Sequence, residues 1–333
     1  MDARVDIPQF DPPPRRDNAN GETRRVGLEL EMAGIRPEHI AKAVIAEIGG
    51  RAQAESAFLT RVHDTALGEF RIELDADVLK NRGYQKHLAE LGIDIGEGKE
   101  REQIEHLLSR LAGLVVPMEL VAPPVPWTQL DALDRIRQRL HQAGARGTHS
   151  SPLYAFGMQI NIEAASLEVS YLLAVLRAFL LRYETLVEHE QVDLARRISP
   201  YIQPFPEEFI AHVLEPDYRP ELTALIDDYL RLTPTRNRPL DLLPLFAHVD
   251  ASRVMNAPVE TALIKPRPAF HYRLPNCRID EPGWSLAAGW NAWVRVEELA
   301  EDDRLRERRQ RKRLSQSSRW RQGLSRLWRR LRR

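Results

Sequence analysis

The 333-residue sequence predicts an α+β fold built around a mainly antiparallel sheet. Segments that alternate between apolar and polar residues occur in adjacent pairs as well as between helical segments, which is typical of antiparallel sheets. The polar positions of these strands are mostly acidic, and the helical segments carry apolar stripes. We therefore expect helices to pack on the apolar face of the sheet and to leave its acidic face open.

The first strand is predicted at residues 25–32, directly after a Pro-rich stretch over residues 1–23 that we expect to be a disordered leader. Glu29 and Glu31 lie on one face of this strand, opposite a row of apolar residues. Two like charges on one strand face repel, and a hard divalent cation such as Mg²⁺ or Mn²⁺ between them would remove that repulsion. A solvent-facing edge strand with two ordinary glutamates fits the same pattern, so this strand alone leaves both interpretations open.

The elements that follow are predicted from periodicity and from their stop signals. Residues 37–49 form a helix, because Ile40 and Val44 recur at helical spacing and Gly49-Gly50 ends the pattern. Strands at 52–63 and 68–75 are joined near Gly68, and the second alternates cleanly.

The middle of the chain continues this alternation of elements. A helix at 100–111 leads into a strand at 115–121, which Pro123-Pro124 ends. Thr128 can cap the next helix, which carries an apolar stripe and stops at Gly144.

The last elements are longer and more apolar. They are a strand at 154–163, a long helix at 167–188, helical pieces broken by prolines at 196–250, a strand at 269–274 and a helix at 285–300.

Five of these strands share one feature, since each presents polar side chains without lysine on a single face. The sets are Glu29 and Glu31; Glu73 and Asp75; Glu119; Gln159, Asn161 and Glu163; His271 and Arg273. Water-facing strands usually mix lysine, threonine and serine with their acids. The absence of lysine therefore favours a metal-binding, active-site face over a merely solvated one.

Five short segments also occur in the order of a known family's motifs. They are GLELE at 27–31, FRIELDADVL at 70–79, ELVAPP at 119–124, FGMQIN at 156–161, and YRLP at 272–275 followed by Trp290-Asn291. Over roughly residues 24–300 the chain thus resembles the bacterial family called putative amidoligases, which is similar to glutamine synthetase and γ-glutamylcysteine ligase. Three positions depart from the pattern: Gln159 replaces a metal-ligating histidine, Ala122 a small hydroxyl residue, and His271 a carboxylate.

This resemblance implies a glutamine synthetase-like catalytic domain at 24–300 that joins a carboxylate to an amine. The expected reaction consumes ATP, passes through an acyl phosphate and uses Mg²⁺ or Mn²⁺. The substrates would be a small-molecule or peptide carboxylate and an amine.

The resemblance also implies roles for individual residues. The metal ligands would be Glu29, Glu31, Glu73, Glu119, Gln159 and Asn161. Arg273, His271 and Glu73 would be catalytic, and Arg197, Lys265, Arg267 and Arg273 would contact the phosphates of ATP. Asp75 and Glu163 would support the ligands. Surface salt bridges explain the arginines and the lysine equally well, and His271 fits a structural role as well as that of a ligand or a base.

The composition predicts where in the cell the protein is found and whether it contains a disulfide. No apolar run is long enough to span a bilayer and the N-terminus lacks a signal-peptide core, so we expect a cytoplasmic protein. A single cysteine, Cys277, excludes an intrachain disulfide.

The formal net charge of zero hides a strong asymmetry. Residues 304–333 hold 14 of the 48 Lys and Arg residues and one acid, a net charge of +13, which leaves −13 on the rest of the chain. Trp320, Leu324, Leu327, Trp328 and Leu331 recur at helical spacing within this segment. We therefore predict a basic amphipathic helix over 301–333 that docks on an anionic membrane surface or an acidic protein partner. Nucleic acid is a less favoured partner, and a solvated tail or one folded back on the acidic body are the alternatives.

Two functions from other classes remain open. In one, the altered site binds a nucleotide or a peptide without turnover. In the other, the protein binds nucleic acid or a membrane surface through its basic tail.

Overall fold

The computed structural model describes residues 9–56, 58–74, 117–150, 156–192, 196 and 200–315. Its strands are β1 (Arg25–Met32), β2 (Arg51–Ser56), β3 (Leu59–His63), β4 (Phe70–Leu74), β5 (Met118–Pro126), β6 (Met158–Glu163), β7 (Leu240–Asp241) and β8 (Ala269–Tyr272). Its α-helices are α1 (Pro37–Ile48), α5 (Leu130–Gln142), α6 (Val169–His189), α8 (Glu207–Val213), α9 (Leu222–Leu232), α10 (Leu243–Val249), α11 (Ala251–Met255) and α12 (Ala287–Glu301), and a helix over 303–315 follows. Short 3-10 helices cover Trp127–Gln129, Thr148–Ser150, Pro200–Ile202 and Thr261–Leu263.

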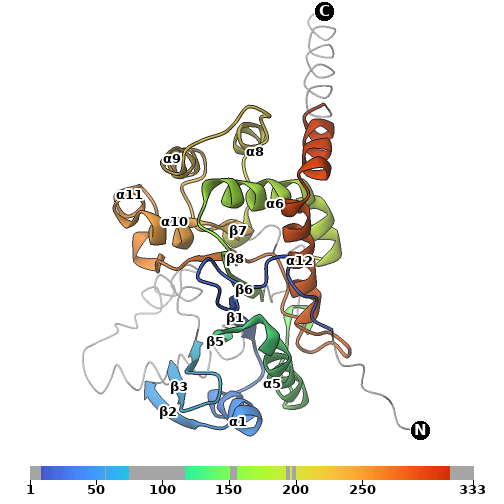
Figure 1. Ribbon diagram of the computed structural model, residues 1–333. Coiled ribbons are helices and arrows are strands. Elements are labelled where there is room, and N and C mark those ends of the chain that lie inside the picture. The colour runs from blue at the N-terminus through green and yellow to red at the C-terminus, as the bar shows by residue number, and fades with distance from the viewer. Residues whose placement is uncertain are drawn as a thin grey trace, which may run out of the picture.

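Within these residues the strands form one open sheet in the order β2-β3-β4-β5-β1-β6-β8-β7 (Figure 1). Every pairing is antiparallel. The predicted α+β class and antiparallel sheet are thereby confirmed. The first strand along the chain lies near the centre of the sheet, where β5 and β6 flank it.

One face of the sheet is apolar and packs on helices. Leu28 pairs with Ile160 and Leu30 with Met158, and all four side chains are buried. Helix α12 approaches this face so closely that a Cβ atom on Gly289 would lie 2.5 Å from Cε of Met158. Helices α1 and α5 pack against each other and against strands of the β2–β5 half. Together these contacts make one continuous core.

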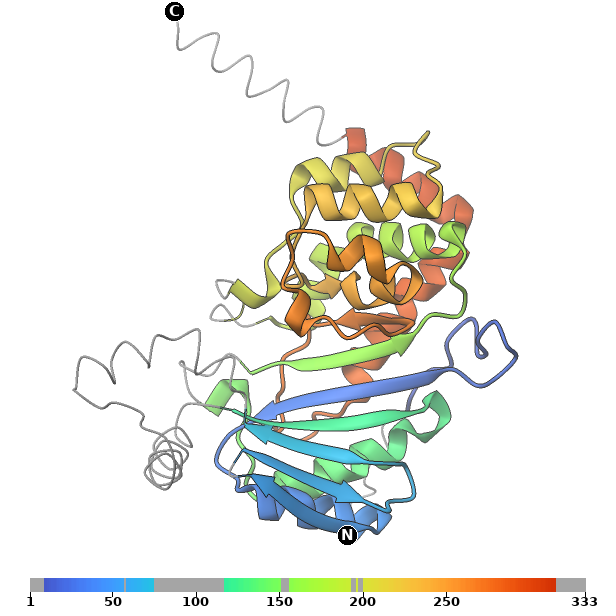
Figure 2. The ribbon, with the colours of Figure 1, turned by 90° about the vertical axis from the view of Figure 1, so that its left-hand side faces the viewer.

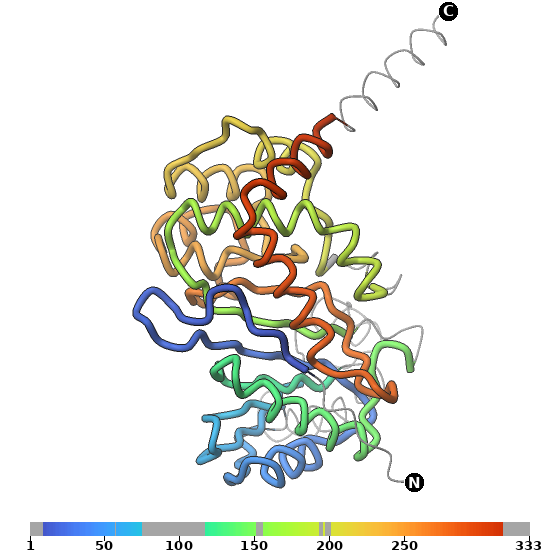
Figure 3. Tube along the Cα trace, turned by 45° about the vertical axis from the view of Figure 1, so that its right-hand side comes forward, coloured from blue at the N-terminus to red at the C-terminus, as the bar shows by residue number. Residues whose placement is uncertain are grey.

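A second group of helices extends the molecule beyond the β7 edge. Helix α6 packs across α12 (Figure 3). Helix α10 packs against β8. Figure 2 shows α8 to α11 gathered at this end, opposite the β2 edge. No helix in the described ranges is long and apolar enough to cross a bilayer.

A buried ion pair joins the start of β1 to α12. The side chains of Arg24 and Glu297 are only 1% and 3% exposed, and two N–H···O bonds of 2.7 and 2.8 Å connect them. Arg24 also donates from Nε to the Glu163 carbonyl and from Nη1 to the Arg15 carbonyl. Trp293 donates its indole N–H to Glu297 at 2.8 Å. Because nearly all polar atoms of the pair are satisfied, the charge can be held in the interior.

Residues 9–23, which we expected to be part of a disordered leader, are ordered in the structure. Trp290 donates its indole N–H to the carbonyl of Asp11, whose own N–H donates to Asn291. Asn18 closes a turn by accepting from the backbone N–H groups of Asn20 and Glu22. These long-range contacts to α12 order a segment whose composition alone suggests a loop.

Other differences concern strand limits. The segment predicted as one strand at 52–63 is the β2–β3 hairpin, because the chain reverses between Ser56 and Leu59 without glycine or proline. Strand β5 runs on through Pro123 and Pro124, where the β1 register shifts and the β4 pairing has already ended at Val121. Proline has no backbone N–H to donate to a neighbouring strand. It is tolerated here because the regular hydrogen bonding between the strands is interrupted at this point.

Two further differences concern single features of the chain. Thr128 does not cap α5, which has no side-chain cap at its start. The sequence did not predict β7, which has only two residues. The predictions at 1–8, 75–116, 154–155, 193–195, 197–199 and 316–333 fall outside the described residues.

Replacing Glu297 with glutamine leaves the Arg24 guanidinium buried without its anion. We expect Glu297→Gln to lower the free energy of unfolding by about 3–5 kcal/mol, as measured by urea denaturation. Glu298→Gln, one residue further along α12 and about half exposed, should cost less than about 0.5 kcal/mol. Equal effects of the two substitutions would show that the buried ion pair contributes no more to the free energy of unfolding than an exposed one.

Candidate active site

The strand register collects the sequence-predicted residues on one face of the sheet. Glu73 of β4 pairs with Glu119 of β5, which in turn pairs with Glu31 of β1. Paired residues of antiparallel strands point to the same side, with Cβ atoms about 4.5–5.5 Å apart. We call Glu73, Glu119 and Glu31 the acidic row.

Two further rows run parallel to the acidic row. In one, Glu29 lies between Val121 of β5 and Gln159 of β6. In the other, Gly27, Asn161, His271 and Asp241 follow one another from β1 to β7. The described members of the five predicted sets therefore share one surface. Asp241 joins them although the sequence did not single it out.

Hydrogen bonds hold the amide side chains against Glu29. Asn161 donates from Nδ2 to Oε1 of Glu29 at 2.8 Å, and Gln159 donates from Nε2 to Oδ1 of Asn161 at 2.7 Å. The two amide groups thus have defined orientations. Gln159 contacts Asn161 through its amide nitrogen and not through its oxygen. Gly27 lies beside Asn161, and a Cβ on the glycine would make an ordinary contact of 3.4 Å with the Asn161 Cβ.

The ends of the acidic row are held differently. Glu31 accepts from the backbone N–H of Gly157 at 2.7 Å. Glu73 forms an ion pair with Arg71 of the same strand at 2.8 Å. A cation bound at the Glu73 end would therefore compete with the Arg71 guanidinium.

The side chains of this face are of the types that bind a divalent metal ion, but within the described ranges they are not grouped closely enough to surround one. Carboxylate and amide oxygens are the ligands that Mg²⁺ prefers. Among the described residues, however, no three His, Cys, Asp or Glu side chains are grouped so as to hold a metal ion. Asp75, predicted to support the ligands, lies outside those residues.

His271 lies in a dry environment at the β8 end of this face. It is 5% exposed, and neither ring nitrogen has a hydrogen-bond partner within the described ranges. Burial lowers the pKa of His271 well below its ordinary value, and the charges of Arg273, Arg267 and Arg236 lower it further. The imidazole is therefore neutral at pH 7, with a free lone pair.

Arg273 is positioned by a buried carboxylate. Its Nη2 donates at 2.9 Å to Asp241, which is fully buried and also accepts from the Leu243 N–H at 3.0 Å. Burial raises the pKa of Asp241, while the Arg273 charge opposes that rise. Nε of Arg273 is buried and has no partner in the described part of the chain.

The remaining predicted residues divide into three groups. Arg267 lies near enough to His271 to lower its pKa, and its backbone N–H donates to the Pro244 carbonyl. No contact within the described ranges places Lys265 at this face. Glu163 accepts from the Arg25 N–H and from Asn18, so it holds the first residues of the fold. Arg197 lies outside the described residues.

Arg196 is a residue that sequence reasoning missed. It is 5% exposed and donates to the carbonyls of Arg273, Leu274 and Pro275. A Cβ on Gly157 would lie 2.8 Å from its Nη2, so the glycine makes room for the guanidinium beside Glu31. Nothing in an Arg-Arg dipeptide distinguishes the buried member from its neighbour, and only the fold reveals it.

His271 predicts a specific pH dependence of stability. Its pKa is depressed in the folded state, so below about pH 6.5 the unfolded chain binds a proton that the folded chain does not. The free energy of unfolding should therefore fall as the pH falls, by at most about 2 kcal/mol from this group between pH 6.5 and 5.

Urea denaturation at pH 7 and pH 5 measures this loss. His271→Asn should show a loss smaller by about that amount, whereas replacement of the exposed His39 by asparagine should keep the wild-type loss. An unchanged loss in His271→Asn would contradict a buried neutral imidazole.

Comparison with known proteins gives one match. A family model described as "Putative amidoligase enzyme" matches residues 22–295, which include all strands of the sheet and most of α12. Neither the curated proteins nor the solved structures contain a match to the chain.

Proposed function

The chain belongs to the putative amidoligase enzyme family, and from this membership we propose that it is an ATP-dependent carboxylate–amine ligase. The reaction would take place over the polar face of the sheet. The observation that carries this proposal is the register that aligns Glu73, Glu119 and Glu31 on neighbouring strands, beside Glu29 and its amide partners. The glutamine synthetase-like character of the fold is part of the same proposal.

The acidic row supports a divalent cation as the partner of this face. Like charges directly opposite one another destabilise a sheet, and a shared cation offsets that cost. Mg²⁺ or Mn²⁺ would be held by Glu29, Glu31, Glu73 and Glu119, with Gln159 and Asn161 as neutral donors. Bound there, the metal and ATP would supply an activated phosphoryl group for the substrate carboxylate.

The protein's own residues would then carry three tasks. Arg273, which Asp241 holds in place, would bind an anionic group of the substrate or of the phosphates through its planar fork. Arg267 would add positive charge to the same end of the face, with Lys265 and Arg197 as further phosphate contacts. His271, neutral at pH 7, would accept the proton that an attacking amine must lose when the amide forms.

The substrates follow from this chemistry only by class. They are a carboxylate and an amine, on small molecules or peptides, which react through an acyl phosphate to give an amide, ADP and phosphate. Residues 304–333 would bring the enzyme to an anionic membrane surface or an acidic protein partner, with nucleic acid as the less favoured partner.

A second candidate function is a nucleotide- or peptide-binding protein without turnover. One observation favours it: Gln159 stands on the polar face and donates its amide to Asn161, where a histidine ligand would offer a nitrogen lone pair. Binding of nucleotide without release of phosphate would support this alternative.

Glu31→Gln tests the metal–nucleotide site directly. Saturating Mg²⁺ with a non-hydrolysable ATP analogue should raise the unfolding midpoint of the wild type, because a ligand that binds only the folded state stabilises it by about 2.7 kcal/mol at 100 times its Kd. The rise should be lost in Glu31→Gln and kept in Glu38→Gln, an exposed glutamate on α1.

Turnover is read separately from binding. With ATP, a carboxylate pool and hydroxylamine as the amine, the wild type should form hydroxamate and release phosphate, and Glu31→Gln should do so at least about 100-fold more slowly. No midpoint rise in the wild type at saturating ligand would overturn the ATP-ligase proposal.

A further inference from the structure

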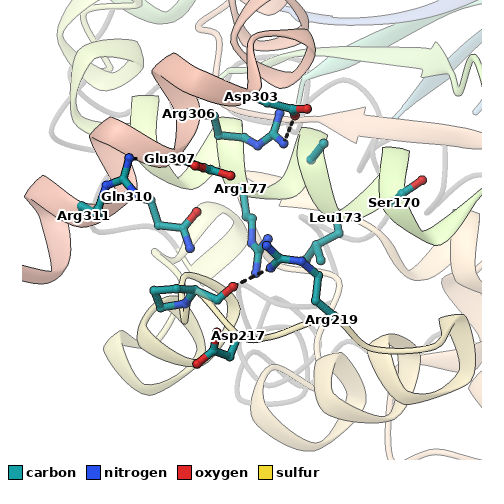
Figure 4. Close-up of a pocket in the computed structure, with 12 residues that line it drawn as sticks. Ser170, Leu173, Arg177, Asp217, Arg219, Asp303, Arg306, Glu307, Gln310 and Arg311 are labelled. Carbon is teal, nitrogen blue, oxygen red and sulfur yellow. Dashed lines mark hydrogen bonds and ion pairs between the residues drawn. The ribbon is translucent and has the colours of Figure 1, made fainter.

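A cavity of about 470 Å³ has no strand residue in its lining. Its walls are the first half of α6, the turn at 216–219 and the helix over 303–315 (Figure 4). None of its lining residues belongs to the polar face of the sheet. Its volume is within the usual range for small-molecule sites.

Two guanidinium groups meet in this cavity. Arg177 is 6% exposed and donates to the carbonyls of Val213, Glu215 and Tyr218 at 2.8–3.1 Å. Arg219 donates to the same Tyr218 carbonyl at 3.1 Å and to that of Pro216 at 2.6 Å. Figure 4 shows the two side chains next to each other at the centre of the site.

Neither of these arginines is neutralised by an acid among the described residues. Their hydrogen bonds go only to backbone carbonyls, and neither takes part in a salt bridge. Burial, together with the neighbouring charges of Arg219 and Arg306, lowers the pKa of Arg177 to about 10. Even so, Arg177 is protonated at pH 7, so the cavity holds a buried, uncompensated positive charge.

The acidic residues of the cavity do not remove this charge. Asp303 is paired with Arg306, and Glu307 lies 3.9 Å from Arg311. Asp217 turns its carboxylate away from the two central guanidinium groups (Figure 4). The positive charge of Arg177 and Arg219 therefore faces the open volume.

The third wall of the cavity is a fixed part of the structure. Asp302 caps the helix over 303–315 by accepting from the Leu305 N–H at 2.9 Å. Gln310, 5% exposed, donates its amide to the Leu214 carbonyl. This wall lies beyond residues 22–295, so the cavity is not a feature that the family match accounts for.

We propose that this cavity binds a phosphoryl group between Arg177 and Arg219, with Arg306 at its rim. Arginine forks match phosphate and carboxylate oxygens, but two uncompensated guanidinium groups balance the charge of about −2 on a phosphate monoester better than that of a carboxylate. The source of the group is a free phosphorylated small molecule or the headgroup of an anionic lipid. The site is separate from the proposed catalytic face.

The experiment uses the full chain in EDTA. EDTA removes divalent cations, so phosphate cannot be held through a metal ion at the proposed ligase site. Loss of phosphate binding in a variant of Arg219 then distinguishes the cavity from the arginines of the sheet face. Inorganic phosphate should raise the unfolding midpoint by about 2–4 °C above a chloride control of equal ionic strength. Arg219→Gln should abolish this rise, and Arg51→Gln, an exposed arginine on β2, should retain it.

Two further arms complete the test. Arg306→Gln, at the rim, should weaken phosphate binding at least threefold. It replaces Arg219→Gln as the test variant if Arg219→Gln does not fold. Vesicles of phosphatidate and phosphatidylcholine distinguish the sources: sedimentation of the wild type that is reduced in Arg219→Gln, without an effect of free phosphate, assigns a lipid headgroup. Binding of neither probe, or binding unchanged in Arg219→Gln and Arg306→Gln, would overturn the proposal.

Discussion

The structure depends on the buried ion pair between Arg24 and Glu297. Through it the start of β1, the end of β6 and helix α12 meet at one point, and the Arg15 carbonyl ties residues 9–23 to the same place. An isolated charge at this depth would be very costly, so each partner is tolerated only while the other is present. The central strand and the helix that covers it are therefore placed together.

The strand register brings the polar side chains of the sheet together, and it also brings like charges close to one another. Apolar side chains of β1 enter the core on one side, so Glu29 and Glu31 must emerge on the other, beside Glu119, Gln159 and Asn161. Arg71 offsets part of the charge at Glu73, and Asp241 fixes Arg273 at the opposite edge. The face thus carries acids at one end and the partly buried Arg273 at the other.

Much of the fold could be predicted because its signals are local. The alternation at 25–32 and the helical spacing at 37–49 each need only a short window, and both elements are present. The hairpin at β2–β3 was missed because its turn has no glycine or proline, and β5 continues past Pro123-Pro124 because a register shift accommodates them. The shared face of the polar residues follows from strand period, whereas Asp241 on a two-residue strand and the buried Arg196 carry no periodic signal.

The sequence by itself determined the family, the antiparallel sheet and the residue types that line its polar face, because these depend on motif order and on period-two alternation. Only the tertiary structure decided which charges are buried and what they face. His271 is neutral and without a partner in the described part of the chain, and Arg177 meets Arg219 across 42 residues of sequence. Burial and long-range electrostatics depend on every element packed around a group, and no short window of sequence contains that information.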